Sequence, residues 1–125
     1  MWGTVPVTFI GKTPQQEIDQ LYARMDVLVA PSVWPESYGL VTREAAAAGV
    51  WVIASSIGAI GEDLIEGDTG TVIEPKPAAL LQVFKKLELS SVPFVAMPPV
   101  RSQRDVAKQV AELSEIYQDI FKRGE

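Results

Sequence analysis

The sequence predicts an α/β fold in which a parallel sheet carries helices on both faces. Three short apolar runs, residues 5–10, 27–30 and 50–54, have the pattern of strands that are buried on both sides. Stretches with helical spacing alternate with these runs, and such alternation is typical of a parallel sheet. The 125 residues fit one domain, and a hydrophobic fraction of 47% is enough to fill its core.

The first strand is expected from Val5 to Ile10 and ends at Gly11. A helix then begins near Thr13, which suits an N-cap, with Pro14 at the first helical position and Gln16 completing a capping box. Its apolar face is formed by Ile18, Leu21, Tyr22 and Met25. The second strand covers residues 27–30 and is closed by a proline.

The middle of the chain alternates loops with regular elements. Residues 31–37 contain two prolines and two serines and form a loop, and residues 39–48 form an alanine-rich helix with Gly49 as its left-handed C-cap. After the third strand, residues 55–61 form a second loop. A short helix is then expected from Glu62 to Glu66, where Gly67 stops it.

The last third of the chain is mostly helical in pattern. Residues 71–73 are extended, and a helix is expected around Leu80, Val83, Phe84 and Leu87. Residues 92–99 are apolar but interrupted by prolines, so they indicate an irregular or edge segment. The final helix covers residues 102–121, with a stripe formed by Val106, Val110, Leu113, Tyr117 and Ile120. This order of elements makes the predicted fold Rossmann-like.

The composition excludes several classes of function. The chain has no cysteine and no histidine, so it has no disulfide framework, no thiol chemistry and no serine–histidine triad. A net charge of −5 argues against nucleic acid as a partner. No apolar run approaches the roughly 20 residues of a membrane span, and no signal peptide is visible. We therefore expect a cytoplasmic protein.

Ligands of open α/β sheets bind beyond the carboxyl ends of the strands, where residues 11–13, 31–39 and 55–61 are expected to emerge. Gly39 falls at a predicted helix start, where a missing side chain lets a ligand approach the backbone. The first helical N–H groups have no internal partner and suit a phosphate or pyrophosphate. The alternative is that Gly39 only permits the turn, because glycine turns before helices are common.

Glu36 and Glu44 flank this helix start. Carboxylates repel a phosphate, but they agree with such a site if they accept hydrogen bonds from sugar or ribose hydroxyls while the phosphate stays at the N–H groups. The alternative is that both are ordinary surface acids. These residues alone leave both interpretations open.

The segment resembles the signature of GT-B glycosyltransferases of the group 1 (family 4) class, in which two glutamates with seven residues between them enclose an aromatic-Gly-Leu-Val segment. Here Glu36 and Glu44 enclose Tyr38, Gly39, Leu40 and Val41. The surrounding stretches resemble the family in the same order, and they cover most of the chain: residues 7–11, 21–22, 26–32, 44–49, 52–55, 67–70 and 115–117. The sequence departs from the family at Trp51, where proline is usual, in the alanines 46–48, which replace Ala-Met-Ala, and at Tyr38, which replaces the commoner phenylalanine.

The resemblance implies retaining transfer of a sugar from a nucleotide-diphosphate sugar to an unknown acceptor, without a bound metal or other cofactor. Glu36, the catalytic candidate, would contact hydroxyls of the transferred sugar, and Glu44 would hold the ribose hydroxyls. The remaining donor-binding residues would be Gly39, Leu40 and Val41 through their N–H groups at the diphosphate, the adjacent Tyr38, and Gly11, Lys12 and Thr13 near the nucleobase.

The family's enzymes have an N-terminal acceptor domain and a C-terminal donor domain. The resemblance implies that residues 1–125 are a truncated half of a GT-B donor domain, beginning at about its fourth strand. The isolated chain would then lack turnover, and any membrane association would lie in absent parts. The fourth strand pairs with the first in the family, so residues 5–10 would be an exposed edge, and we expect a homodimer through this strand.

Three further side chains lie near the expected site. Trp34 either lines the donor pocket or, as we favour, packs as a loop aromatic on the domain surface. Arg43 is expected on the outer helix face, and Lys12 is a neighbour of the base or the phosphate.

Other interpretations place the chain in other classes. The main alternative is a non-catalytic nucleotide-sugar-binding or assembly module of the same fold. Another GT-B enzyme, such as a phosphorylase or epimerase, shares the phosphate chemistry. A dinucleotide-binding domain is disfavoured because no G-x-G-x-x-G stands between a strand and a helix. The sequence does not identify the base, the sugar or the acceptor.

Overall fold

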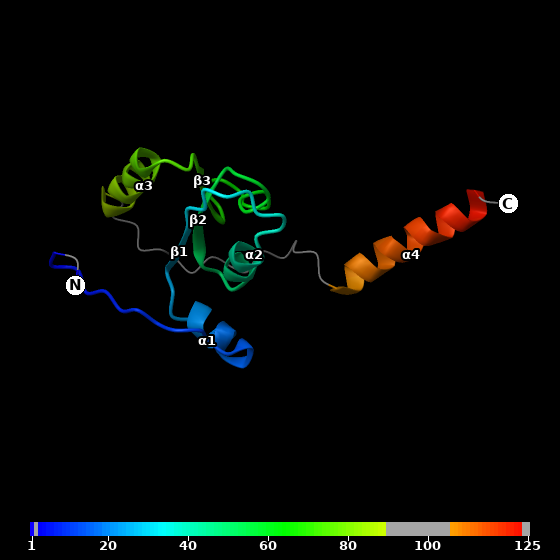
Figure 1. Ribbon diagram of the computed structural model, residues 1–125, viewed down its shortest axis with the longest axis horizontal. Helices are drawn as coiled ribbons and strands as arrows, with labels where there is room; N and C mark the ends of the chain where they lie inside the picture. Colours follow the sequence, from blue (N-terminus) through cyan, green and yellow to red (C-terminus); the bar gives the residue numbers. More distant parts are fainter. Residues whose placement is uncertain (2, 90–105, 124–125) are drawn as a thin grey trace.

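The computed structural model describes Met1, residues 3–89 and residues 106–123 (Figure 1). The elements follow in this order: η1 (Gln15–Glu17), α1 (Ile18–Tyr22), β1 (Val27–Ala30), α2 (Leu40–Ala47), β2 (Trp51–Ser55), β3 (Gly70–Ile73), α3 (Pro77–Leu89) and α4 (Val106–Arg123). Residues 92–99, for which the sequence indicates an irregular or edge segment, lie outside the described residues.

The three strands form one parallel sheet in the order β1-β2-β3. In the register, Val27 pairs with Trp51 and Ser55 pairs with Ile73, so β2 is the central strand. Trp51, at the position where proline is usual in the family, begins this strand, and its N–H donates to the Asp26 carbonyl over 3.1 Å. The predicted parallel α/β sheet is therefore confirmed.

Helices cover both faces of the sheet. Alternate strand residues point to opposite sides, so each face presents its own apolar side chains to a helix. On one face, Val52 and Ala54 of β2 pack with Ala45 and Ala46 of α2. On the other face, Ile53 packs with Ile73 and with Val83 of α3. Figure 1 shows α2 and α3 on opposite sides of the sheet, so the Rossmann-like layering predicted from the apolar runs is confirmed.

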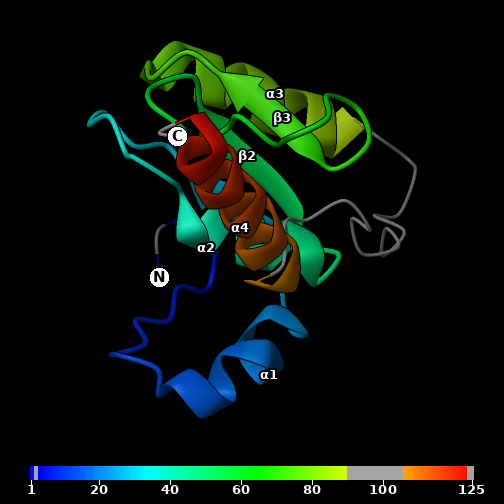
Figure 2. The ribbon, with the colours of Figure 1, turned by 90° about the vertical axis from the view of Figure 1, so that its right-hand side faces the viewer.

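The predicted first strand is wrong. Residues 5–10 form no named strand, and Val5, Phe9 and Ile10 are 60%, 85% and 63% exposed. This blue segment runs outside the sheet in Figures 1 and 2. Apolar and β-branched residues favour an extended backbone, but a strand exists only where a neighbour satisfies its N–H and C=O groups. Val5 carries an isolated bridge assignment, but none of the three described strands pairs with residues 5–10.

The predicted start of the first helix is also wrong. The helical region begins as a 3-10 turn at Gln15 with Pro14 as its N-cap residue, and no side chain caps it. The capping box between Thr13 and Gln16 therefore does not form. Helix α1 follows with only five residues, and it is anchored to the core through the buried Tyr22.

The predicted helix at residues 62–66 is a series of turns instead. The Ile65 N–H donates to the Thr69 hydroxyl over 2.9 Å, and the Gly67 N–H donates to the Gly70 carbonyl over 3.2 Å. These partners take donors that a helix would use internally. A segment this short gains too few helical bonds to compete with them.

The other helices agree with the sequence pattern. Helix α2 ends in a turn at Gly49, whose φ of 82° is the predicted left-handed C-cap. Helix α4 carries an exposed apolar stripe and is set apart from the sheet in Figure 1. Among the described helices, none combines the length and the apolar character that crossing a membrane requires.

Candidate functional site

The start of α2 is the centre of the candidate site. Gly39 has φ 65° and ψ 53°, a left-handed conformation, and the right-handed helix follows from Leu40. Successive residues of opposite hand turn their N–H groups toward one concave point, which is a backbone anion nest. Within the described residues the N–H groups of Gly39, Leu40 and Val41 donate no hydrogen bond. Leu40 and Val41 are 59% and 54% exposed, whereas Gly39 is buried, so the nest is accessible from the side of Leu40 and Val41.

The reason for glycine at position 39 differs from the sequence interpretation. A Cβ there would lie 2.7 Å from the Ile60 Cα and 3.0 Å from the Thr42 hydroxyl. The missing side chain thus makes room for the protein's own loop rather than for a ligand. Both this close approach and the positive φ require glycine, so the turn interpretation holds, and the approach of a ligand to this backbone stays a prediction.

The loops after β1 and β2 are joined side by side at the carboxyl ends of the strands. Glu36 and Gly58 form a parallel bridge, and the Ala59 N–H donates to the Glu36 carbonyl over 2.8 Å. The buried Ser55 hydroxyl donates to the Ser32 carbonyl over 2.7 Å. These contacts confirm that residues 31–39 and 55–61 meet at one edge, as predicted for open α/β sheets.

Glu44 lies in the second turn of α2 beside α1. The Tyr22 hydroxyl donates to Glu44 Oε2 over 3.0 Å, and both line a pocket of about 420 Å³ together with Asp19, Ala47 and Ala48. Burial, followed by the hydrogen bond and charge of Glu44, raises the pKa of Tyr22 to about 12. Tyr22 is therefore a permanent donor at neutral pH. In the described part of the chain Oε1 of Glu44 accepts no hydrogen bond, so it is open to a further donor.

Glu36 is exposed and lies in the loop before α2. Its backbone is held by the bridge to Gly58, while its carboxylate makes no hydrogen bond or ion pair within the described residues. A fixed backbone with an unengaged carboxylate suits a group that contacts a ligand hydroxyl. The assigned role of Glu36 nevertheless stays a prediction.

Arg43 has a different place from the one predicted. Its side chain is only 16% exposed, its Nε donates to the Tyr38 carbonyl over 2.7 Å, and its guanidinium lies 4.2 Å from the centre of the Tyr38 ring. It also forms ion pairs with Asp63 and with Glu62, the latter at 3.8 Å. The outer-face prediction is wrong because the turns after Gly61 bring two acids to α2, and nothing local in the sequence signals that contact.

Gly11, Lys12 and Thr13 are not brought to the nest. They precede η1 in the segment that forms no strand, and the described residues contain no hydrogen bond or ion pair between them and α2. Their predicted place at a strand end is wrong, because the strand is missing. Their role near a nucleobase is a separate matter and stays a prediction.

Trp34 is 76% exposed, so the prediction that it packs on the domain surface is wrong. Within the described part of the chain its hydrogen bonds involve only its backbone. The Trp34 N–H donates to the Ser32 hydroxyl over 3.3 Å, and that hydroxyl lies 3.0 Å from the Trp34 carbonyl. This small turn leaves the indole in solvent.

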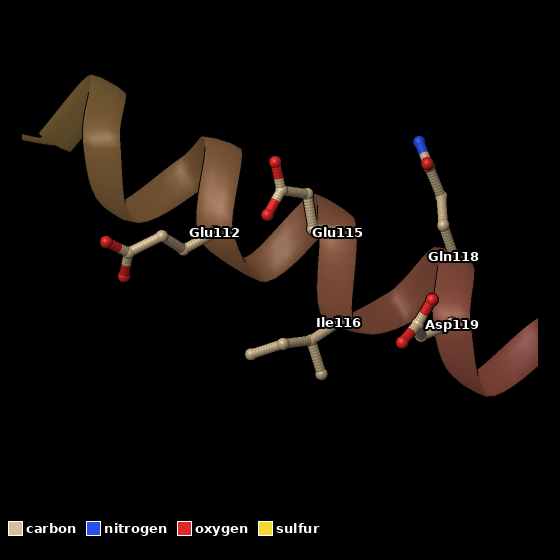
Figure 3. Close-up of a pocket in the computed structure, with 5 residues that line it drawn as sticks. All are labelled: Glu112, Glu115, Ile116, Gln118 and Asp119. Atoms are coloured by element: carbon tan, nitrogen blue, oxygen red, sulfur yellow. The ribbon is translucent and has the colours of Figure 1, made fainter.

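A second hollow lies on α4, and Figure 3 shows its lining. All of its side chains come from this one helix and point in different directions: Glu112, Glu115, Ile116, Gln118 and Asp119. Among the described residues no other element contributes to the lining, and a single helix face carries no site. Across the described residues no group of three or more acidic side chains is arranged to hold a metal ion.

Comparisons with known proteins place the chain. The family model described as glycosyl transferases group 1 matches residues 4–111. A glycogen synthase of Mycobacterium tuberculosis is 42% identical over 71 residues, which are 57% of this chain and 17% of that protein. A D-inositol 3-phosphate glycosyltransferase of Corynebacterium urealyticum is 31% identical over 115 residues, 86% of this chain and 27% of that protein.

Among solved structures, a sucrose-phosphate synthase from Thermosynechococcus elongatus matches 93% of this chain and 30% of its own, with a TM-score of 0.75 and 25% identity. The chain thus spans less than a third of the length of these similar proteins. The family match covers most of the chain, including α2 and both glutamates. This chain belongs to the group 1 glycosyltransferases.

Proposed function

We propose that this chain binds the nucleotide-diphosphate sugar of a retaining glycosyltransferase, with the diphosphate at the N-terminus of α2. The observation that carries the proposal is the open nest of Gly39, Leu40 and Val41 N–H groups in a chain of this family. Preorganised N–H donors at the positive end of a helix dipole stabilise negative charge. They act most strongly on charge that develops as a phosphate leaves.

Glu44 is proposed to hold the ribose. Its Oε2 accepts a hydrogen bond from the Tyr22 hydroxyl, and this bond fixes the carboxylate. Its Oε1 can accept a hydrogen bond from a ligand. A fixed acceptor is expected to bind a hydroxyl more tightly than a mobile one, because less side-chain entropy is lost on binding. The pocket beside Glu44 offers space for a ligand group.

Glu36 is proposed to contact hydroxyls of the transferred sugar. The same proposal includes transfer without a bound metal, Gly11, Lys12 and Thr13 near the nucleobase, and an acceptor domain outside these residues. It also includes pairing of residues 5–10 with a second copy. The names of the similar proteins refer to glycogen, D-inositol 3-phosphate and sucrose phosphate, which differ, so no acceptor is assigned.

The proposal is tested by calorimetric titration of the chain with UDP, ADP and GDP and with their glucose conjugates. Glu44→Gln should weaken binding of both the diphosphate and its conjugate by about tenfold, the effect of one hydrogen bond to a charged group. Glu36→Gln should weaken only the conjugate. Glu17→Gln, an exposed acid in η1, is the matched control and should bind like the unchanged chain.

No binding of any of these ligands by a folded chain would contradict the proposal and favour a non-catalytic module. Equal losses from Glu36→Gln for the diphosphate and its conjugate would contradict the sugar role of Glu36. We also expect no transfer by these 125 residues alone, measured as release of the nucleoside diphosphate. Turnover with any acceptor would contradict that expectation.

A further inference from the structure

We propose that Arg43 is a positioning residue that aims the N–H group of Gly39 at the bound diphosphate, while Thr42 holds the following peptide unit. The inference rests on the proposed function, since it concerns the same nest. The Arg43 side chain contacts Tyr38, the residue that precedes the nest, at its carbonyl oxygen and at its ring. Its role follows from the geometry of two consecutive peptide units.

The first unit joins Tyr38 to Gly39. Its carbonyl oxygen accepts the hydrogen bond from Arg43 Nε at 2.7 Å. The described peptide bonds include no cis bond, and in a trans unit the C=O and N–H groups point in opposite directions. Fixing the Tyr38 carbonyl toward Arg43 therefore turns the Gly39 N–H away from Arg43. This constraint matters because glycine by itself populates many backbone conformations.

The second unit joins Gly39 to Leu40. The Gly39 carbonyl accepts from the Thr42 hydroxyl at 2.8 Å and from the Arg43 backbone N–H at 3.2 Å. Thr42 is 2% exposed, and its hydroxyl also lies 2.8 Å from the Ile60 carbonyl, which ties this unit to the second loop. The Leu40 N–H is thereby turned toward the open side of the nest.

The charge of Arg43 is already balanced. Its guanidinium forms ion pairs with Asp63 and Glu62 and lies over the Tyr38 ring, in a side chain that is 16% exposed. A cation between two carboxylates adds little attraction for a distant anion. Arg43 therefore acts through the direction of the peptide units rather than through its own charge.

The experiment uses the full chain as Arg43→Lys, which keeps the charge but loses the planar fork, and as Arg43→Gln, which loses both. Arg24→Gln, an exposed arginine after α1, is the control. Amide resonances of Gly39 and Leu40 are recorded by ¹H–¹⁵N NMR in the free chain and during titration with pyrophosphate, UDP, ADP and GDP. Resonances of the buried Val52 and Ile53 report whether the fold is intact.

Both Arg43 variants should shift the Gly39 resonance in the free chain more than the Leu40 resonance, because the Thr42 hydroxyl and the backbone N–H of residue 43 still hold the Gly39–Leu40 unit. They should also weaken diphosphate binding by about tenfold, the loss expected for a misdirected charge-assisted hydrogen bond. Wild-type affinity in Arg43→Lys would overturn the inference, because charge would then suffice. Unmoved Gly39 resonances in the free variants would overturn it as well. If the unchanged chain bound no diphosphate, the proposed function would be contradicted, and with it the claim that the Gly39 N–H faces a ligand. The resonances of the free variants would still show whether Arg43 orients the Gly39 N–H.

Discussion

Two regions of the molecule have structures opposite to those that their local sequences favour. Residues 5–10 are as apolar as the strands that form, yet they stay exposed and outside the sheet. Residues 31–39 and 55–61 are loops rich in proline, serine and glycine, yet they are joined by a bridge, a backbone hydrogen bond and two buried hydroxyls. Order here follows the number of partners rather than the local propensity.

The comparison matters for the site, because its parts come from both regions. The nest and both glutamates belong to the joined loops and α2. Gly11, Lys12 and Thr13, which are expected near the nucleobase, directly follow residues 5–10 outside the sheet. Tyr22 is the first buried residue of the described chain, so the N-terminal region becomes attached to the core there. The following predictions test this division, beginning with the largest expected effect.

The largest effect is expected from matched glycine substitutions in the two regions. Gly58 has φ 64°, and a Cβ there would lie 2.5 Å from the Glu36 carbonyl oxygen, so Gly58→Ala should cost about 3 kcal/mol of unfolding free energy. Gly11 has nothing within 4 Å of its added Cβ, and Gly11→Ala should change stability by less than about 0.5 kcal/mol. Urea unfolding measures both, and equal midpoints would show that the loops are not held as described.

A somewhat smaller effect is expected at high pH. The folded pKa of Tyr22, about 12, lies above its ordinary value of 10.0, so the unfolded chain loses this proton first. The stabilisation is complete below about pH 10 and is lost as the pH rises through 12, and it amounts to about 2 kcal/mol. Tyr22→Phe should abolish this part of the loss. An identical alkaline profile in Tyr22→Phe would mean that α1 is not attached through this contact.

A third test removes one hydroxyl that joins the loops. Ser55→Ala leaves the Ser32 carbonyl without its donor and should cost about 1 kcal/mol in urea unfolding. The control is Ser114→Ala, since Ser114 also donates to a carbonyl but is exposed on α4. That change should stay within about 0.5 kcal/mol. Similar costs for both would remove the distinction between the joined loops and an exposed helix surface.

The smallest effect on stability is expected from substitutions in residues 5–10. Here the measured quantity is the molecular mass in solution. Light scattering at low micromolar concentration should find a dimer, because an exposed apolar segment favours pairing with a second copy. Phe9→Lys with Ile10→Lys should give a monomer of unchanged stability, since both side chains are exposed. Val33→Lys, another exposed apolar site, is the control and should remain dimeric. A monomeric unchanged chain would contradict the pairing.

The sequence alone determined the elements whose signals are local. The apolar runs at residues 27–30 and 50–54 predicted β1 and β2, and Gly49 predicted the end of α2. The spacing of Glu36 and Glu44 around Gly39 identified the segment that the family match now includes. Continuous apolar runs and helix caps involve near neighbours in the chain, so a single sequence shows them.

Only the tertiary structure decided which of these signals found partners. In the structure residues 5–10 lie outside the sheet, and residues 62–66 form turns instead of the predicted helix. Arg43 is largely buried and forms ion pairs with Glu62 and Asp63 instead of lying in solvent. The close approach of Ile60 is a second reason, besides the positive φ, why position 39 requires glycine. Each of these outcomes depends on residues distant in the chain, and the pairing of distant groups leaves no periodic trace in the sequence.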